Sequence, residues 1–282
     1  MSQDNAAPLA IVCSGGSLPF AVADAAIAQG RRVILFAVHG IADAGRVAHY
    51  PHKWFSLGQF GRLMSAMRKA GCRDMVMVGS LARPPMFSVR FDLTTLRLFP
   101  RLFRMYRGGD NHLLSELGRI FEDHGFRMLG AHEIAPELLM PEGDLTRRRP
   151  SESDRADIDR GFEVLTAIGA YDVGQAAVVA NGQVLAIESV GGTDQLLDHV
   201  AQLRAEGRLS TPVGLGVLVK APKPAQDHRY DLPTIGPKTV EGVANAGLAG
   251  IAVAAGEALA ADLVRAVELA DAKNIFIVGL KR

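Results

Sequence analysis

The sequence has little cysteine and almost no net charge. Its 282 residues include only two cysteines, Cys13 and Cys72, which are too few for a disulfide framework and favour a reducing compartment. Lysine and arginine number 31 against 30 aspartate and glutamate, a net charge of +1, so the basic excess typical of nucleic-acid-binding proteins is missing. The composition therefore excludes a disulfide-rich secreted domain and argues against nucleic acid as a partner.

Long apolar runs are also missing. No run approaches the roughly 18 apolar residues that a membrane-spanning helix needs, and no charged segment precedes an apolar one near the N-terminus. We therefore expect a soluble, cytoplasmic protein without a signal peptide. Apolar residues make up 48% and charged residues 22% of the chain, which is enough apolar material for the cores of two ordinary domains.

The N-terminal half alternates strand and helix patterns. A stretch at 126–132 also has the pattern of a strand. Strand, helix and strand at this spacing predict a Rossmann-like parallel sheet with right-handed crossovers. Further strands are predicted at 9–13, 32–38 and 75–78, and helices at 18–29, 59–70 and 113–124.

A seam rich in proline, glycine and arginine divides the two halves. We interpret 135–152 as an exposed linker between an N-terminal domain, 1–134, and a C-terminal α/β catalytic domain, 153–282. Ser151 can cap a helix that ends at about 168. The second domain begins with a hairpin whose Asn181-Gly182 turn is the commonest type I′ signal. Its other predicted elements are helices at 193–206, 238–246 and 258–270 and strands at 214–220, 250–253 and 275–278.

A glycine turn joins the first strand to the first helix. Glycines allow a ligand to approach the backbone, and a helix N-terminus attracts phosphate. A simple tight turn is the alternative interpretation. The dinucleotide fingerprint is incomplete, because a third glycine is missing and His39 stands where a ribose-binding acid is expected, so a nicotinamide cofactor is not favoured. The candidate phosphate-binding residues are Gly15, Gly16, Ser17 and Leu18.

The segment from Lys220 to Gly236 has the composition of a rigid catalytic loop. Prolines stiffen it directly after a strand, where catalytic groups often lie, although a solvated surface loop is the alternative. Its cations can neutralise a diphosphate, and its two acids can hold Mg²⁺ or orient a water molecule. The candidate residues are Lys220, Lys223, Gln226, Asp227, Arg229, Asp231 and Thr234.

Two isolated acids are weaker candidates. Asp110 follows two glycines and most simply caps the helix after it. Glu188 ends the second hairpin strand and is a tentative metal ligand. The sequence has no HxxxH, HxH or CxxC spacing, so a zinc site has little support, and any metal would be a hard cation held by carboxylate and phosphate oxygens.

Residues 91–107 have the pattern of a basic amphipathic helix. Arg97, Arg101 and Arg104 recur at helical spacing among large apolar residues. Such a helix can contact a lipid surface or an anionic amphiphile, which makes peripheral contact with the inner membrane an expectation. A core-facing helix with a solvated arginine face is the alternative.

Taken together, these segments resemble the LpxI-type UDP-2,3-diacylglucosamine pyrophosphatases of lipid A biosynthesis over nearly the whole chain. The most specific segment is KAPKP at 220–224 followed by DLPTIG at 231–236. The N-terminal extension 1–8 is the main departure. The other matching segments are GGSLP at 15–19, the stretch 108–114, GAHE at 130–133, DVGQ at 172–175 and GTD at 192–194.

The resemblance implies a Mg²⁺-dependent hydrolase that converts UDP-2,3-diacylglucosamine to UMP and 2,3-diacylglucosamine 1-phosphate (lipid X), by attack of water at the sugar-side phosphorus. It also implies a homodimer and a lipid-linked substrate held between the two domains.

By the matching motif Asp231 is the essential acid, and Asp227 and Lys223 are further catalytic candidates. A nucleotide-sugar or lipid-phosphate binding protein of the same fold, without turnover, is the alternative. The candidate substrate-binding residues are Gly15, Gly16, Ser17, Leu18, Asp110, Gln175, Thr193, Lys220, Gln226, Arg229 and Thr234.

Overall fold

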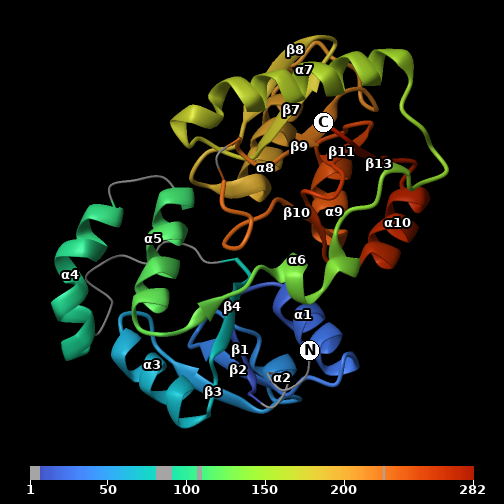
Figure 1. Cartoon of the computed structure of the whole chain (residues 1–282). Coiled ribbons are helices and arrows are strands. Elements are labelled where there is room, and N and C mark those ends of the chain that lie inside the picture. The colour runs from blue at the N-terminus through green and yellow to red at the C-terminus, as the bar shows by residue number, and fades with distance from the viewer. Residues whose placement is uncertain (1–6, 81–90, 107–109, 225) are drawn as a thin grey trace. The chain divides into compact units, whose positions relative to one another are not determined.

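The structure is a computed structural model of the chain, and it describes residues 7–80, 91–106, 110–224 and 226–282, except for the side chains of 99–100 and 102–112 (Figure 1). The chain divides into two compact units. The N-terminal unit comprises the residues up to Pro136 together with Arg229–Asp231, and the C-terminal unit comprises Glu137–His228 and Leu232–Arg282. These units confirm the prediction of two α/β domains.

A parallel five-stranded sheet forms the centre of the N-terminal unit. Its strand order is β3-β2-β1-β4-β5, and every neighbouring pair is parallel. The order reverses between β1 and β4, and open α/β sheets bind ligands at the carboxyl end of the strands at such a point. The strands are β1 (Leu9–Cys13), β2 (Val33–Val38), β3 (His52–Phe55), β4 (Asp74–Val78) and β5 (Arg127–Met128).

Helices cover both faces of this sheet (Figure 1). Apolar residues spaced three and four apart place Leu63, Met64 and Met67 of α3 in one cluster with Phe121 of α5. α1 contacts β1 and β2, and its buried residues lie outside that cluster. The helices are α1 (Leu18–Ala28), α2 (Ala44–Val47), α3 (Phe60–Lys69), α4 (Leu93–Tyr106), α5 (Asp110–Asp123) and α6 (Ala131–Ile134).

The predicted strand at 126–132 is wrong beyond β5. The Glu133 carboxylate accepts a hydrogen bond from the Gly130 N–H at 2.6 Å, which closes the first turn of α6. His132 therefore lies in a short helix and not at the end of a strand.

A short piece of the second half belongs to the N-terminal unit. Tyr230 is buried in the same apolar cluster as the core residues of α3 and α5. A Cβ on Gly118 of α5 would lie 2.0 Å from the Tyr230 ring, so only glycine fits there. Arg229 donates to Glu122 of α5 at 2.8 Å. Nothing in the local sequence pattern predicted this placement.

A mixed six-stranded sheet forms the centre of the C-terminal unit. Its order is β6-β13-β11-β9-β7-β8. β9, β11 and β13 are parallel, β7 is antiparallel to β9, and β7 and β8 form the predicted hairpin with Asn181 at φ 50° and Gly182 at φ 74°. The strands are β6 (Gly143–Asp144), β7 (Ala176–Ala180), β8 (Gln183–Ile187), β9 (Val217–Lys220), β11 (Gly250–Ala254) and β13 (Phe276–Leu280).

One helix covers one face of this sheet and three cover the other. Alternate β7 residues divide accordingly, because Ala177 clusters with α7 and Val178 with α8, α9 and α10. Ser151 caps α7 as predicted, since its hydroxyl accepts from the Asp154 N–H at 3.2 Å. The helices are α7 (Glu152–Ile168), α8 (Gly192–Ala205), α9 (Pro237–Asn245) and α10 (Leu263–Ala272).

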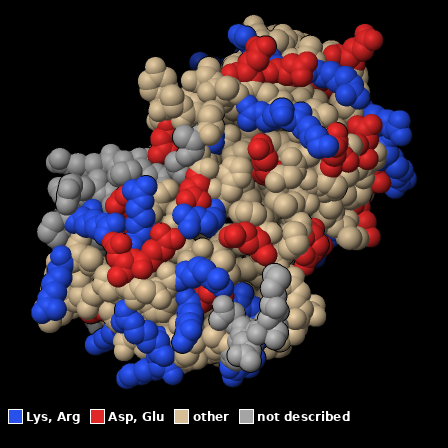
Figure 2. All heavy atoms as spheres, in the orientation of Figure 1, with Lys and Arg blue, Asp and Glu red and all other residues tan. Residues whose placement is uncertain are grey.

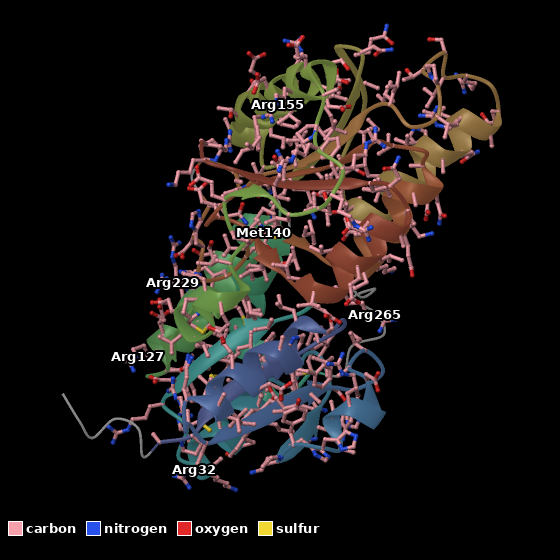
Figure 3. The ribbon with its side chains drawn as sticks, turned by 90° about the vertical axis from the view of Figure 1, so that its right-hand side faces the viewer. Arg32, Arg127, Met140, Arg155, Arg229 and Arg265 are labelled. Carbon is pink, nitrogen blue, oxygen red and sulfur yellow. The ribbon has the colours of Figure 1, made fainter. Side chains whose placement is uncertain are left out.

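Pairing between distant segments explains two further differences from the sequence pattern. The range 258–270 is not a single helix, because β12 (Leu259–Ala260) pairs with β10 (Thr234–Ile235) before α10 begins. In the range expected to form an exposed linker, β6 joins the sheet beside β13, and Met140 is buried in the core shared with α8, α9 and α10 (Figure 3). Local composition carries no signal for either pairing.

The described surface mixes both charge signs. Lysine and arginine lie among aspartate and glutamate over the face shown in Figure 2, as the net charge of +1 leads one to expect. Within the described ranges, no helix is both long and apolar enough to cross a bilayer.

Candidate functional site

The glycine turn in the N-terminal unit is tied to the end of β4. The N–H of Gly15 donates to the Ser80 carbonyl at 2.9 Å, and the Ser80 N–H donates back at the same distance. The Ser14 hydroxyl donates to the Val78 carbonyl at 3.0 Å. A Cβ on Gly15 would lie 2.8 Å from the Ser80 hydroxyl and 3.1 Å from the Ser80 carbonyl oxygen, so a larger residue here would require Ser80 to shift.

These contacts reduce the number of backbone N–H groups in the turn that can donate to a phosphate. The N–H of Gly15 is already used, so the predicted phosphate contacts would come from Gly16, Ser17 and Leu18. Gly16 is exposed and has φ +90°, a conformation that other residues rarely adopt. The Leu18 side chain is buried, which leaves only its backbone N–H for a ligand.

One edge of the C-terminal sheet gathers several predicted residues. β9 and β8 end at this edge and β7 begins there, because β7 is antiparallel to both. Lys220 ends β9, Glu188 follows β8 and Gln175 precedes β7. A turn that begins at Ser189 connects β8 to α8, and Thr193 lies in the first turn of α8.

A continuous network of hydrogen bonds connects these residues. Lys220, whose side chain is buried, donates from Nζ to the Thr193 hydroxyl at 2.8 Å and to the Thr234 carbonyl at 3.0 Å. The Thr193 hydroxyl donates to Glu188 Oε1 at 2.6 Å, and Glu188 Oε2 accepts from the Gln175 N–H at 2.6 Å. The Thr193 hydroxyl thus links the positive charge of Lys220 to the negative charge of Glu188. We call these residues, Gln175, Glu188, Thr193, Lys220 and Thr234, the Lys220 cluster.

Lys223 lies in a separate arrangement three residues further on. Its buried ammonium forms an ion pair with Asp172, which occupies the left-handed region at φ 51°. The Lys223 N–H donates to the side-chain oxygen of Gln226 at 2.9 Å, and Gln226 is also buried. Asp172 lies in the DVGQ segment, 51 residues before Lys223, and sequence spacing does not predict that the two residues pair.

The remaining loop residues divide between the units. Asp231 is half-buried in the N-terminal unit, and the neighbouring Arg229 (Figure 3) pairs with Glu122 and lies 5.0 Å from the Tyr230 ring centroid. Asp227 is half-buried in the C-terminal unit. The predicted candidate Asp110 begins α5, but its side chain lies outside the described residues.

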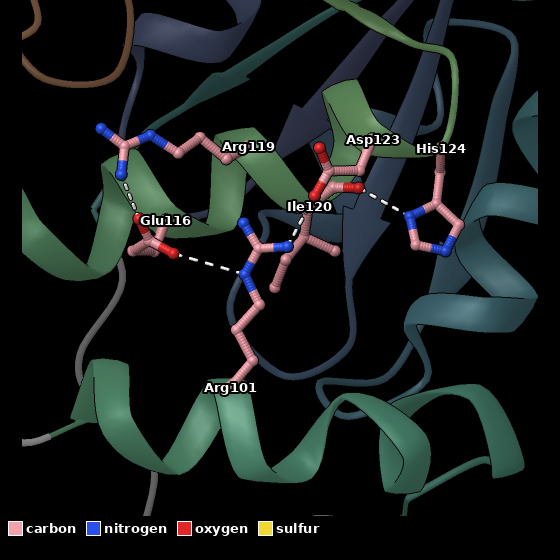
Figure 4. A network of polar contacts seen from close by, with 6 residues as sticks. All are labelled: Arg101, Glu116, Arg119, Ile120, Asp123 and His124. Atoms are coloured by element: carbon pink, nitrogen blue, oxygen red, sulfur yellow. Dashed lines mark hydrogen bonds and ion pairs between the residues drawn. The ribbon is translucent and has the colours of Figure 1, made fainter.

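The basic amphipathic helix is confirmed as α4, but its arginines do not share one solvent-facing role. Arg101 donates to Glu116 of α5 at 3.3 Å and to Asp123 at 2.6 Å (Figure 4). Arg97 is exposed, and the side chain of Arg104 lies outside the described residues. Arg101 therefore joins α4 to α5. The sequence of α4 alone does not predict this contact, because both acids lie in α5.

Known protein families match both halves of the chain. A model described as the LpxI N-terminal domain matches residues 8–138, and one described as the LpxI C-terminal domain matches 141–278. A curated relative from Caulobacter vibrioides (strain ATCC 19089 / CIP 103742 / CB 15), the UDP-2,3-diacylglucosamine pyrophosphatase LpxI, is 38% identical over 272 residues, which is 96% of this chain and 97% of that protein. The chain belongs to the LpxI family.

The LpxI matches include most of the candidate residues. The N-terminal match contains the glycine turn, and the C-terminal match contains the Lys220 cluster. Arg229–Asp231 fall within the C-terminal match, although they pack in the N-terminal unit. Asp231, the predicted essential acid, is therefore part of the N-terminal unit, whereas the residues just before Arg229 and just after Asp231 belong to the C-terminal unit.

Asp231 and Glu188 are the two predicted ligands for Mg²⁺. Over the described part of the chain, no three histidine, cysteine, aspartate or glutamate side chains gather as a metal site. Both carboxylate oxygens of Glu188 accept a hydrogen bond from a protein group, and each oxygen keeps a second lone pair. Mg²⁺ commonly uses one or two carboxylates together with substrate phosphates, so a site with a single carboxylate, from Asp231 or from Glu188, is compatible with this ion.

Proposed function

We propose that this LpxI chain hydrolyses the diphosphate of UDP-2,3-diacylglucosamine to UMP and 2,3-diacylglucosamine 1-phosphate in lipid A biosynthesis. The observation that carries the proposal is the 38% identity to a protein of that name across 96% of this chain. The alignment includes 97% of the relative, so the proposal does not rest on a match to one part of it.

The reaction requires charge compensation at the diphosphate. Negative charge increases on the phosphate oxygens as water attacks, so cations and N–H groups placed beside them accelerate the step. Lys220 supplies such a cation in the C-terminal unit, where its burial and its bond to Thr193 restrict its position. In the N-terminal unit, the N–H groups of Gly16 and Ser17 are the proposed phosphate donors.

The reaction also requires an activated water molecule. Asp231 is the proposed group that orients or deprotonates this water for attack at the sugar-side phosphorus. Mg²⁺, held by Asp231 and substrate oxygens, would neutralise part of the developing charge when it is bound. Asp227 is the second acid proposed for this chemistry, and Lys223 is the remaining proposed catalytic residue.

Several expectations stay predictions. They are the placement of the substrate between the two domains, a homodimeric assembly, a cytoplasmic location and peripheral contact with the inner membrane. The exposed Leu93 and Leu96 beside Arg97 on α4 support the last of these, because apolar and basic groups together favour anionic lipid surfaces.

The proposal is tested with purified protein, synthetic UDP-2,3-diacylglucosamine and Mg²⁺. We expect UMP and 2,3-diacylglucosamine 1-phosphate to appear in equal amounts, and omission of Mg²⁺ with added chelator to stop the reaction. A matched sample of the Asp231→Ala variant controls for contaminating hydrolases. Substrate binding without either product would contradict the proposal and favour the non-catalytic binding protein.

A further inference from the structure

We infer that Glu188 is a positioning residue for Lys220, acting through the hydroxyl of Thr193, and that it is not a metal ligand. This inference rests on the proposed function, because it assigns a role within the same diphosphate chemistry. It concerns the residues of the Lys220 cluster, which all lie in the C-terminal unit.

The direction of the hydrogen bonds carries the argument. A threonine hydroxyl has one proton and two lone pairs. Its proton goes to Glu188 Oε1 at 2.6 Å, because an ionised carboxylate can only accept. A lone pair of the same oxygen is then left for the Lys220 ammonium, which lies 2.8 Å away and can only donate. Glu188 thus fixes the Thr193 hydroxyl as an acceptor for Lys220.

The backbone holds the Glu188 carboxylate in place. Its second oxygen accepts from the Gln175 N–H at 2.6 Å, and the Glu188 N–H donates to the Ala176 carbonyl at 2.8 Å. A Cβ on Gly174 would lie 2.4 Å from the Glu188 Cβ, so the chain before β7 closes directly on residue 188. The carboxylate is therefore set by the two hairpin strands.

The same backbone reaches the strand that carries Lys220. The Gln175 carbonyl accepts from the Ala221 N–H at 3.1 Å, immediately after Lys220. The second acceptor of the ammonium, the Thr234 carbonyl, comes from β10 at 3.0 Å. The Thr193 hydroxyl and the Thr234 carbonyl thus orient two of the three N–H bonds of the Lys220 ammonium. Because the ammonium is tetrahedral, the direction of its third N–H bond is then also fixed. A cation whose position is already fixed can contact a diphosphate without first being reordered.

A metal ligand and a positioning residue predict different behaviour. If Glu188 held Mg²⁺, its loss would raise the Mg²⁺ concentration needed for half-maximal activity, and excess Mg²⁺ would restore the rate. If Glu188 orients Thr193, its loss lowers kcat/KM at every Mg²⁺ concentration. Removal of the Thr193 hydroxyl then has the same effect, because both changes break the same chain of hydrogen bonds.

The experiment compares Glu188→Gln, Thr193→Val, Thr193→Ser and the Glu188→Gln/Thr193→Val double variant. We expect each of the two disruptive single changes to lower kcat/KM by about 10-fold or more, and the double variant to lose no more than either. Thr193→Ser keeps the hydroxyl and should retain activity. Asp198→Asn, a change of an exposed acid on α8, is the matched control.

Equilibrium binding gives a readout without turnover. In an Asp231→Ala background, Glu188→Gln should weaken substrate binding by the same factor as Thr193→Val. Melting temperatures near that of the parent protein ensure that only folded variants are compared, and if Glu188→Gln fails to fold, the Thr193→Val and Thr193→Ser pair decides the test.

Three results would overturn the inference while leaving the proposed function intact. They are unchanged kcat/KM in Thr193→Val, additive losses in the double variant, and rescue of Glu188→Gln by excess Mg²⁺. Failure of the wild-type protein to release UMP would instead contradict the proposed function itself.

Discussion

The ammonium of Lys220 lies 2.8 Å from the hydroxyl of Thr193, which joins the end of β9 to the first turn of α8. A buried lysine is costly unless its charge is compensated, and here the compensating carboxylate lies beyond the hydroxyl. The cation is therefore held at the sheet edge by polar groups rather than by direct contact with an acid. Such a cation can still attract a phosphate.

Replacement of Lys220 tests the importance of this cation. Lys220→Met keeps the length of the side chain and removes the charge, so we expect kcat/KM to fall by about 10²-fold with little loss of fold. Lys238→Met removes an exposed lysine that pairs with Asp194 at 2.6 Å and serves as the control. Steady-state kinetics of the two variants decide the matter, and equal activities would rule out a role for Lys220 in the reaction.

Asp231 is the acid on which the chemistry is predicted to depend. Asp231→Ala should lower kcat by about 10²-fold or more, the loss expected when a general base or metal-positioning group is removed. Substrate affinity should change little, because the cations and the glycine turn remain. Single-turnover UMP release is measured together with equilibrium binding. Near-normal turnover by folded Asp231→Ala would transfer the role to Asp227, whose alanine variant is made in parallel.

A buried acid in α7 should stabilise the hairpin of the C-terminal unit. Asp157 is only 3% exposed and accepts from the N–H groups of Asn181 at 3.0 Å and Gly182 at 2.7 Å. Asp157→Ala leaves both donors without that acceptor, so we expect a loss of about 2 kcal/mol in the free energy of unfolding. Urea titration followed by circular dichroism gives this value. The exposed Asp159→Ala is the control, and equal losses in both variants would refute the assignment.

Stability of the N-terminal unit should depend on pH through Asp74. Burial raises the pKa of Asp74, but hydrogen bonds and charges from Arg127 and Arg31 outweigh burial and hold the pKa below its ordinary value. A depressed pKa in the folded state means that the carboxylate stabilises the fold above the unfolded pKa of about 3.9. That contribution is lost as the pH falls through the lower, folded pKa.

The Asp74→Asn variant gives the corresponding measurement. It should be less stable than the parent protein at pH 7 by about 1–3 kcal/mol, and the difference should shrink as the pH falls below about 4. The single tryptophan, Trp54 in β3, reports unfolding of this unit by its fluorescence. A difference that stays constant between pH 7 and pH 3 would show that Asp74 carries no pH-dependent stability.

Elements with a strong local signal could be predicted from the sequence. The period of apolar residues predicted α1, α3 and α5, and the short apolar runs predicted β1, β2 and β4, because burial on one or both faces dictates these patterns. Asn181-Gly182 marked the hairpin because few other residues adopt positive φ at both turn positions. Ser151 marked the start of α7 because its side chain satisfies a free N–H group.

Contacts between distant segments could not be predicted in this way. Tyr230 packs against Gly118 through surface complementarity that neither local sequence reveals. The bond from Thr193 to Glu188 depends on the turn between β8 and α8, so the sequence pattern does not reveal Glu188 as a hydrogen-bond acceptor. The chemical reaction itself came from the family resemblance, since spacing alone indicates only a phosphorylated ligand.

Hydrolysis in water labelled with ¹⁸O tests both the proposed reaction and its point of attack. Purified protein is incubated with UDP-2,3-diacylglucosamine and Mg²⁺ in labelled water, and both products are analysed by mass spectrometry. We expect UMP without label and 2,3-diacylglucosamine 1-phosphate carrying one ¹⁸O atom, as attack at the sugar-side phosphorus requires. Label in UMP would contradict the proposed point of attack, and substrate recovered intact after prolonged incubation would contradict the proposed hydrolase activity.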